Sequence, residues 1–179
     1  MKLRYVLAVI FCLGFNPLMS AEEVIVDYSY NGNHNTDFSS IGVALKIENV
    51  IDDRGSDPRL IADEYLAEEP LSEIIYTALV QGLEHGGAEL VTADQDMQIQ
   101  GRIVSSELRT VDRSGLESLQ LTIRTQVALQ GRGRTIWETT LFGRGTAPIE
   151  EGIAAALFAS LDRMVRELVN DDYFIIELQ

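Results

Sequence analysis

The sequence predicts an α+β fold in which an antiparallel sheet of four or five strands, arranged as a meander, carries two helices on one face. Apolar residues recur at helical spacing in two stretches, 71–83 and 149–168. Three stretches between them alternate apolar and polar residues, as strands with one buried face do. Because the links between these three are short, neighbouring strands are expected to be antiparallel.

The first elements are two predicted strands separated by a loop. Residues 41–47 place Ile, Val, Leu and Ile at every second position, and residues 24–30 form a less regular apolar run. Residues 31–40, NGNHNTDFSS, are mostly types that tolerate turns. Strand, loop and strand are therefore expected before the first helix.

A helix is predicted from Pro70 to the glycine pair Gly86 and Gly87. Proline suits the first helical position, and glycine is typical beyond the last one. The apolar stripe of this helix consists of Leu71, Ile74, Ile75, Ala78, Leu79, Gly82 and Leu83. Burial of one large apolar side chain contributes roughly 1.5–3 kcal/mol, so the stripe is expected to face a sheet.

That sheet is predicted to follow directly, with strands over 97–103, 119–129 and 137–143. Residues 112–117 and 131–134 are the expected connections. The outward positions of the first two strands are mostly Gln, Arg and Thr. Because a polar outer face needs no cover, both helices are expected on the opposite face.

The second helix is predicted to start near Pro148 and to extend to Leu168. Each helix also carries a stripe of small residues. These are Ala78 and Gly82 in the first helix and Gly152, Ala156 and Ser160 in the second. We expect the two stripes to face each other, so that the helices approach closely. Residues 173–178 are expected to form a short edge strand or a tail that docks elsewhere.

The first 21 residues are predicted to be a secretory signal peptide. Lys2 and Arg4 precede an apolar run over 5–15, and small residues follow a turn. This run is much shorter than the about 20 residues that a membrane-spanning helix needs. The remainder, 22–179, is expected to be a single α+β periplasmic domain without a transmembrane span.

Cys12 is the only cysteine of the chain. A bacterial lipoprotein signal places a small residue before its lipidated cysteine, but Phe11 stands there. We therefore expect Cys12 to leave with the signal peptide, and lipidation at Cys12 remains the alternative. Without Cys12, the chain has no thiol for a disulfide, for catalysis or for metal binding.

The charge of the chain is strongly acidic, with 14 basic and 28 acidic residues. Removal of Lys2 and Arg4 with the signal peptide leaves 12 basic residues against the same 28 acids, a net charge of −16. Such a field repels phosphate backbones, so no nucleic-acid partner is expected.

The densest candidate site is the acidic connection over 47–70. Its carboxylates are Asp52, Asp53, Asp57, Asp63, Glu64, Glu68 and Glu69. Calcium binding and acid–base catalysis are conceivable, but the spacing matches no calcium loop and nothing indicates a cleft. A solvated connection, in which Arg54 or Arg59 pairs with a neighbouring acid, is the preferred interpretation. With no G-x-S-x-G motif either, we expect no catalytic residues, no metal and no cofactor.

Arginines of the predicted sheet form the candidate partner-binding surface. They are Arg102, Arg124, Arg132, Arg134 and Arg144. Because residues 48–96 are rich in acids, the molecule is expected to be polarised. The arginines are either ordinary outward-facing strand residues or a docking face for an acidic protein, a second copy of the chain or an anionic envelope ligand.

Several stretches together resemble the YajG-like family of bacterial outer-membrane lipoproteins. They are IGVALKIENV leading into DDRGSDPRLI, LSEIIYTALVQGLEHGGAELV, DMQIQGRIVSSEL and the final IEEGIAAALFASLDRMVRELV. The resemblance covers residues 41–178. It implies a small protein on the periplasmic side of the outer membrane, in a family with no assigned biochemical role. The lipobox cysteine of the family is missing.

These observations predict a non-catalytic binding or scaffolding protein of the cell envelope, periplasmic and close to the outer membrane. Its expected partner is a protein or a second copy of the chain, and peripheral contact with a membrane is compatible with the sequence. The alternative is an accessory or carrier subunit in envelope lipid or transport traffic, which needs an apolar groove between helices and sheet. A hydrolase would need a cleft with converging carboxylates.

Overall fold

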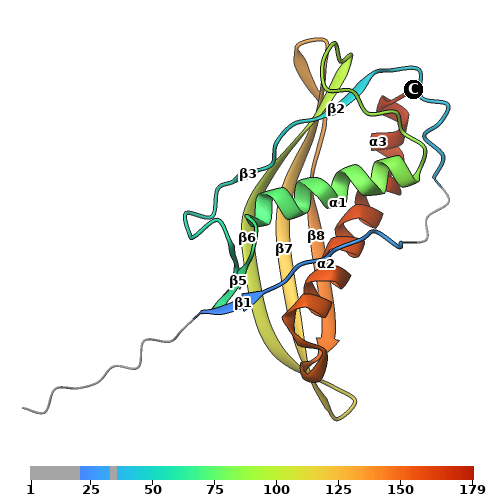
Figure 1. The fold of residues 1–179 in the computed structure, drawn as a ribbon. Helices are drawn as coiled ribbons and strands as arrows, with labels where there is room; N and C mark the ends of the chain where they lie inside the picture. The colour runs from blue at the N-terminus through green and yellow to red at the C-terminus, as the bar shows by residue number, and fades with distance from the viewer. Residues whose placement is uncertain (1–20, 33–35) are drawn as a thin grey trace, which may run out of the picture.

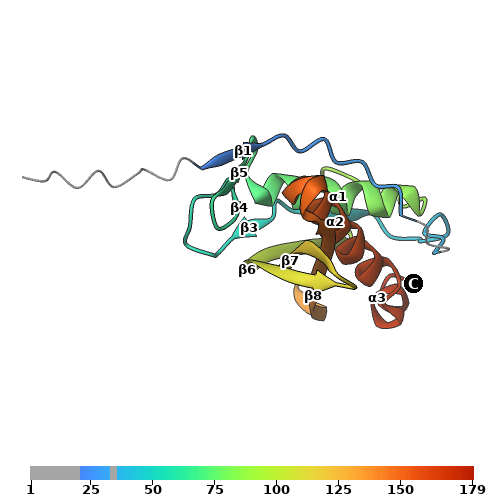
Figure 2. The ribbon, with the colours of Figure 1, turned by 90° about the horizontal axis from the view of Figure 1, so that it is seen from below.

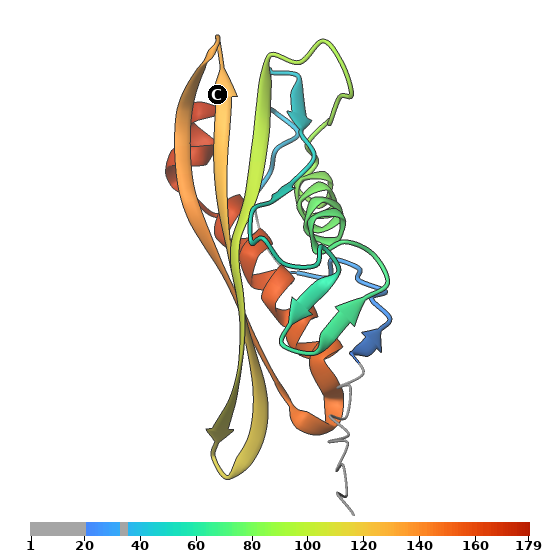
Figure 3. The same cartoon turned by 90° about the vertical axis from the view of Figure 1, so that its left-hand side faces the viewer.

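Three long antiparallel strands form the centre of the fold (Figure 1). The computed structural model describes residues 21–32 and 36–179 of the chain. Strands β6 (Met97–Arg113), β7 (Leu116–Gly131) and β8 (Arg134–Pro148) are neighbours both along the chain and in the sheet. The predicted meander is present, and its strands twist about one another along their length (Figure 3).

Each of these strands is longer than predicted, because the connections are tight turns. Ser114 and Gly115 join β6 to β7, and Arg132 and Gly133 join β7 to β8. All four residues have φ between 54° and 84°, as in the two-residue hairpin turn whose twist matches that of the strands. The stretches expected as connections are therefore mostly strand.

The sheet is mixed rather than purely antiparallel, which corrects the prediction. Strands β2 (Leu45–Ile47) and β3 (Ile51–Asp52) both pair with β6 in parallel. Among the described residues this sheet has five strands, in the order β2-β6-β7-β8 with β3 also beside β6. Parallel neighbours need a long crossover, which residues 53–96 supply.

A second, smaller sheet was not predicted. It has three strands in the order β1-β5-β4, formed by Glu22–Val24, Tyr65–Ala67 and Leu60–Ala62. Strands β4 and β5 form a hairpin within the acidic connection, and β1 pairs with β5 in parallel. The segment that follows the predicted signal peptide is thereby joined to the acidic connection. Residues 1–20, which include Cys12, lie outside the described residues.

The predicted strand over 24–30 is strand only as far as Val24. Beyond it the chain crosses the helices as an extended segment. The Tyr28 hydroxyl donates to Asp162 at 2.8 Å, and the Tyr30 N–H donates to Gln81 Oε1 at 2.7 Å. These contacts with side chains of both helices replace the strand pairing that the apolar run was predicted to make.

Two helices cover one face of the larger sheet, as predicted (Figure 2). Helix α1 (Leu71–His85) runs across the long strands and helix α2 (Gly152–Val169) runs beside β8, after a short 3-10 turn at Ile149–Glu151 (Figure 1). The buried core between helices and sheet includes Ile75, Leu79, Ile99, Ile103, Leu121, Ile123, Leu157 and Leu161. Helical periodicity in the sequence located both helices correctly.

The prediction that the small residues of the two helices face each other is confirmed only in part. Gly82 of α1 faces Val165 of α2, where a methyl group on Gly82 would overlap the valine side chain. The small residues of α2 face the sheet, where a methyl group on Gly145 of β8 would overlap the Ala156 carbonyl oxygen. Close approach therefore occurs between α1 and α2 at Gly82 and between α2 and β8 at Gly145.

The C-terminal stretch forms a short helix, α3 (Asp172–Glu177), and not an edge strand. Asp171 caps the helix by accepting the Phe174 N–H at 2.9 Å, and it also accepts the Trp137 Nε1–H at 3.2 Å. The rings of Trp137 and Phe174 pack with their centroids 5.0 Å apart. An aspartate at the helix start, together with this aromatic contact, fixes the tail as a helix docked on β8.

Candidate functional site

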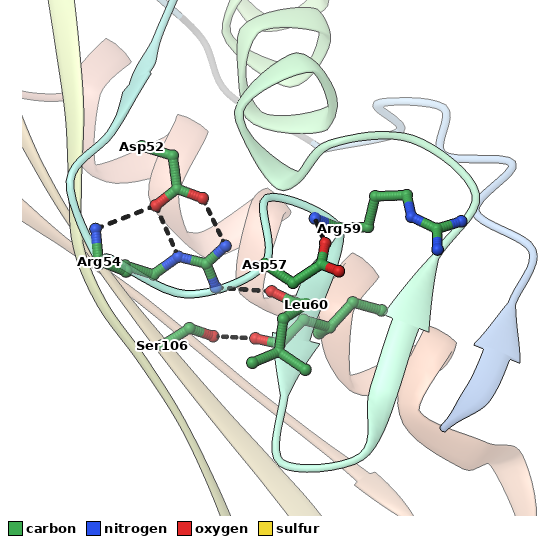
Figure 4. Close-up of polar contacts among 7 residues, drawn as sticks. Asp52, Arg54, Asp57, Arg59, Leu60 and Ser106 are labelled. Atoms are coloured by element: carbon green, nitrogen blue, oxygen red, sulfur yellow. Dashed lines mark hydrogen bonds and ion pairs between the residues drawn. The ribbon is translucent and has the colours of Figure 1, made fainter. Parts of the chain in front are cut away.

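The acidic connection is folded around an ion pair between Asp52 and Arg54 (Figure 4). The Arg54 guanidinium donates from Nε to Oδ1 at 2.8 Å and from Nη2 to Oδ2 at 2.6 Å. Its Nη1 donates to the Leu60 carbonyl oxygen at 2.6 Å. The side chains of Arg54 and Asp52 are only 6% and 11% exposed, so the pair is buried.

The predicted pairing of Arg54 is confirmed, but the connection is not a solvated segment. It contains strands β3, β4 and β5. The Ser106 hydroxyl of β6 donates to the Ile61 carbonyl oxygen of β4 at 2.5 Å (Figure 4). The ion pair and this hydrogen bond attach the β4–β5 hairpin to the larger sheet.

The protonation of Asp52 follows from these contacts. Burial acts to raise the pKa of its carboxyl group, but the hydrogen bonds and positive charge of Arg54 outweigh burial, so the pKa lies below its usual value. Both oxygens of the ionised carboxylate accept hydrogen bonds from Arg54. A general acid or base needs a pKa near the working pH and a free oxygen, so Asp52 fits a structural role.

The other carboxylates of the connection do not converge. Asp57 accepts the Arg59 backbone N–H at 2.8 Å, and the Arg59 guanidinium lies 3.5 Å from Glu23. Asp53 pairs with Arg102 at 3.0 Å. In the part of the chain that the structure describes, no group of three or more His, Cys, Asp or Glu side chains is placed to hold a metal ion.

The five arginines predicted to bind a partner fall into two groups. Arg102, Arg124 and Arg144 point outward from β6, β7 and β8, on the face opposite the helices. Arg132 and Arg134 lie at the β7–β8 turn, at one end of the sheet. The five therefore do not form a single patch.

The three arginines of the outer face differ in their contacts. Arg102 is paired with Asp53, as described above. Arg124 donates to Glu107 at 2.8 Å and to the Ser105 hydroxyl at 3.2 Å, and its guanidinium carbon lies 5.9 Å from the centroid of the Phe142 ring. Arg144 forms no ion pair with any described residue. Of these three arginines, Arg144 alone is thus fully available to an anion.

Sequence reasoning missed Phe142, whose side chain is 44% exposed on the outer face. The alternation with buried Leu141 was a signal that could have found it. Arginine and aromatic side chains together are typical of protein interfaces. The outer face therefore combines charge with an exposed aromatic ring.

Beside Phe142 lies a pocket of about 410 Å³, between the β8 edge of the sheet and α2. It is lined by Arg113, Phe142, Arg144, Thr146, Arg163 and Glu167. Arg113 and Arg163 were not in the predicted set. No sequence pattern brings them together, because they come from β6 and α2 and meet only in the folded chain.

A larger groove of about 870 Å³ lies beside β2 and β3. Its apolar lining includes Ile47, Tyr76, Val80, Leu90 and Val91, and polar side chains of the strands complete its walls. The space between the helices and the centre of the sheet, where a carrier would hold its ligand, is filled by the core. The groove thus lies at the edge of the sheet.

None of the helices formed by the described residues is long and apolar enough to span a bilayer.

Comparisons with known proteins support the fold alone. No family model matches the chain, and no curated protein is significantly similar to it in sequence. Protein XCC0632 from Xanthomonas campestris, described as a DUF330 protein, has a similar structure with a TM-score of 0.66, 16% identity, and 87% of this chain and 97% of that chain covered.

Two weaker similarities were also found. One is to a minor lipoprotein from Acinetobacter baumannii, with a TM-score of 0.45, 12% identity, and 73% of this chain and 91% of that chain covered. The other is to hypothetical protein CT253 from Chlamydia trachomatis, with a TM-score of 0.46, 9% identity, and 75% of this chain and 94% of that chain covered. This chain shares its α+β fold with XCC0632.

Proposed function

We propose that this chain is a non-catalytic binding or scaffolding protein of the bacterial cell envelope, YajG-like in type, periplasmic and close to the outer membrane. The observation that carries the proposal is the outer face of β6, β7 and β8. Three strands of 15 to 17 residues expose one face while the helices and the core occupy the other. An open face of this length offers a partner a large and rigid surface.

The side chains of this face favour binding over catalysis. Arg102, Arg124 and Arg144 lie on it together with the exposed ring of Phe142. Arginine and aromatic residues dominate the binding energy of protein interfaces. Asp52, whose pKa lies below its usual value, is held by Arg54 and is not presented to a ligand.

The charge distribution indicates an acidic partner. The smaller sheet and its turns expose Glu22, Glu23, Asp63, Glu64, Glu68 and Glu69. The outer face of the larger sheet carries Glu107 and Glu138 as well, but its arginines outnumber these acids, so this face is less acidic than the smaller sheet. An acidic segment of another protein, or the acidic surface of a second copy, complements the arginine-bearing face.

Site-specific photo-cross-linking in the native envelope tests this proposal. A photo-reactive residue at Glu138, exposed on the outer face, is expected to capture a partner, and one at Thr77, exposed on α1, is not. Arg102→Gln with Arg124→Gln should weaken the capture, and so should raised salt. Equal capture from both positions, or capture that is independent of salt, would contradict a charged docking face.

The groove beside β2 and β3 supports a second candidate, an accessory or carrier subunit in lipid or transport traffic. Val80 and Leu90 contribute to its apolar wall. Binding of a fluorescent phospholipid that Val80→Asp abolishes, and that Thr77→Asp on the same helix leaves intact, would favour this candidate. Equal binding by both variants would count against it.

A further inference from the structure

We propose that the pocket between β6, β8 and α2 binds a phosphate group. Its walls come from elements far apart in the sequence: Arg113 near the end of β6, Arg144 and Thr146 on β8, and Arg163 on α2. Strand β8 and helix α2 lie side by side here (Figure 1). The inference does not rest on the proposed docking face, although the pocket and that face share Phe142, Arg144 and Thr146 of β8 and Arg113 of β6.

At one side of this pocket, β8 and α2 already hold a carboxylate of the chain itself, that of Glu167. One Glu167 carboxylate oxygen accepts the Phe142 backbone N–H at 2.8 Å, and the other accepts the Arg163 Nε–H at 2.9 Å. The β8 edge and α2 can therefore bind an oxyanion between them. The same contacts orient the Arg163 guanidinium and leave its two terminal nitrogens without a hydrogen bond to any described residue.

Beyond Phe142, the β8 edge has further backbone N–H groups that point away from the sheet. Along an antiparallel strand, N–H groups alternate between the two sides. The Phe142 N–H points away from β7, since it reaches Glu167, so the N–H groups of Arg144 and Thr146 point away from β7 as well. No side chain or loop among the described residues accepts a hydrogen bond from either. Both remain available to an anion.

The charge of the pocket favours a dianion. Its three arginines and one glutamate give a net charge of +2, in a chain whose net charge is −14. Arg113 and Arg144 form no ion pair with any described residue, so neither charge is neutralised. A phosphate group carries about 1.5–2 negative charges near neutral pH, and arginine forks bind it through paired hydrogen bonds. A single carboxylate would leave one positive charge unmatched.

The phosphate could be free in the periplasm or could belong to a lipid head group, since the chemistry of recognition is the same. Titration calorimetry with inorganic phosphate at pH 7.5 and low salt tests the first source. Sedimentation with phosphatidylglycerol vesicles, compared with phosphatidylcholine vesicles, tests the second. Saturable phosphate binding supports the proposal, and the vesicle result assigns the source.

The decisive variant is Arg113→Gln with Arg144→Gln, which is expected to weaken phosphate binding at least tenfold. Its matched control is Arg132→Gln with Arg134→Gln, which removes the same charge at the β7–β8 turn and should leave binding within twofold of the wild type. All four arginines are exposed, so thermal unfolding should be unchanged in both variants. Chemical-shift changes of the Arg144 and Thr146 amides on phosphate addition provide a readout that needs no variant.

Three results would overturn the proposal. The first is the absence of saturable phosphate binding and of shifts at these amides. The second is an equal loss of binding in both double variants, which would assign the effect to general electrostatics. The third is acetate or a glutamate-rich peptide binding as tightly as phosphate, which would assign the pocket to carboxylates. If phosphate binding fails while a partner is still captured from Glu138, the docking face stands and the phosphate pocket does not.

Discussion

Asp52 and Asp53 are adjacent in the sequence, yet they form ion pairs on opposite sides of the larger sheet. Asp52 lies beside the inward-facing Ile103 and binds Arg54, with side-chain exposures of 11% and 6%. Asp53 binds Arg102 on the outer face, with exposures of 61% and 47%. The N–O distances of 2.6 and 3.0 Å are similar, so burial is the main difference between the two pairs.

That difference shows what each side of the sheet contributes. An exposed ion pair stabilises a protein by about 0–1 kcal/mol, because water solvates the separated charges almost as well. Removing one partner of a buried pair costs about 3–5 kcal/mol, because the remaining charge is buried without compensation. The covered side therefore determines stability, and the open side is free to vary or to bind.

The largest expected effect is that of breaking the covered pair. Arg54→Met should lower the free energy of unfolding by about 3–5 kcal/mol, since it leaves the Asp52 carboxylate buried and unpaired. The matched change on the open side, Arg102→Met, should cost less than about 1 kcal/mol. Urea unfolding followed by circular dichroism measures both. Equal losses would mean that burial does not separate the two pairs.

The second effect concerns neighbouring residues of β8 that face opposite sides. Gly145→Ala should destabilise the fold by at least about 1–3 kcal/mol, because the added methyl group overlaps the Ala156 carbonyl oxygen and forces α2 away from the strand. Arg144→Ala, on the open side, should change stability by less than about 0.5 kcal/mol. Melting temperatures of the two variants provide the comparison. An unchanged melting temperature for Gly145→Ala would show that α2 moves without cost.

The third effect is a pH dependence of the covered pair. The folded-state pKa of Asp52 lies below its ordinary value of 3.8, so its contribution is present above that pH and is lost as the pH falls through the folded pKa. The stability difference between wild type and Asp52→Asn should therefore be constant near neutral pH and shrink in acid. A pH-independent difference for Asp52→Asn would contradict the assigned pKa.

The smallest expected effect is a gain in stability. The Thr125 hydroxyl on the covered face is fully buried and has no hydrogen-bond partner among the described residues. Thr125→Val replaces it with a methyl group of similar size and should stabilise the fold by about 1 kcal/mol. Thr122→Val, on the open face of the same strand, should be nearly neutral. Differential scanning calorimetry can detect the gain, and a loss at position 125 would indicate a hydrogen bond in solution.

Local patterns in the sequence determined the two long helices, the three long strands and the polarity of the sheet. Helical spacing over 71–83 and alternation over 119–129 are repeated many times within one element, so no distant contact can easily override them. The link between Asp52 and Arg54 could also be foreseen, because the partners are two residues apart. Their burial could not, since it depends on the hairpin that packs over them.

Only the tertiary structure decided the parallel pairing of β2 and β3 with β6, the smaller sheet, and the surface that the small residues of α2 contact. It also decided that the final stretch is helical and that Arg113, Arg144 and Arg163 share one pocket. Each of these depends on contacts between segments tens of residues apart, whose free energy comes from the packing of specific neighbours. Periodicity in a sequence reports which face of an element is buried, but it carries no information on which other element buries it.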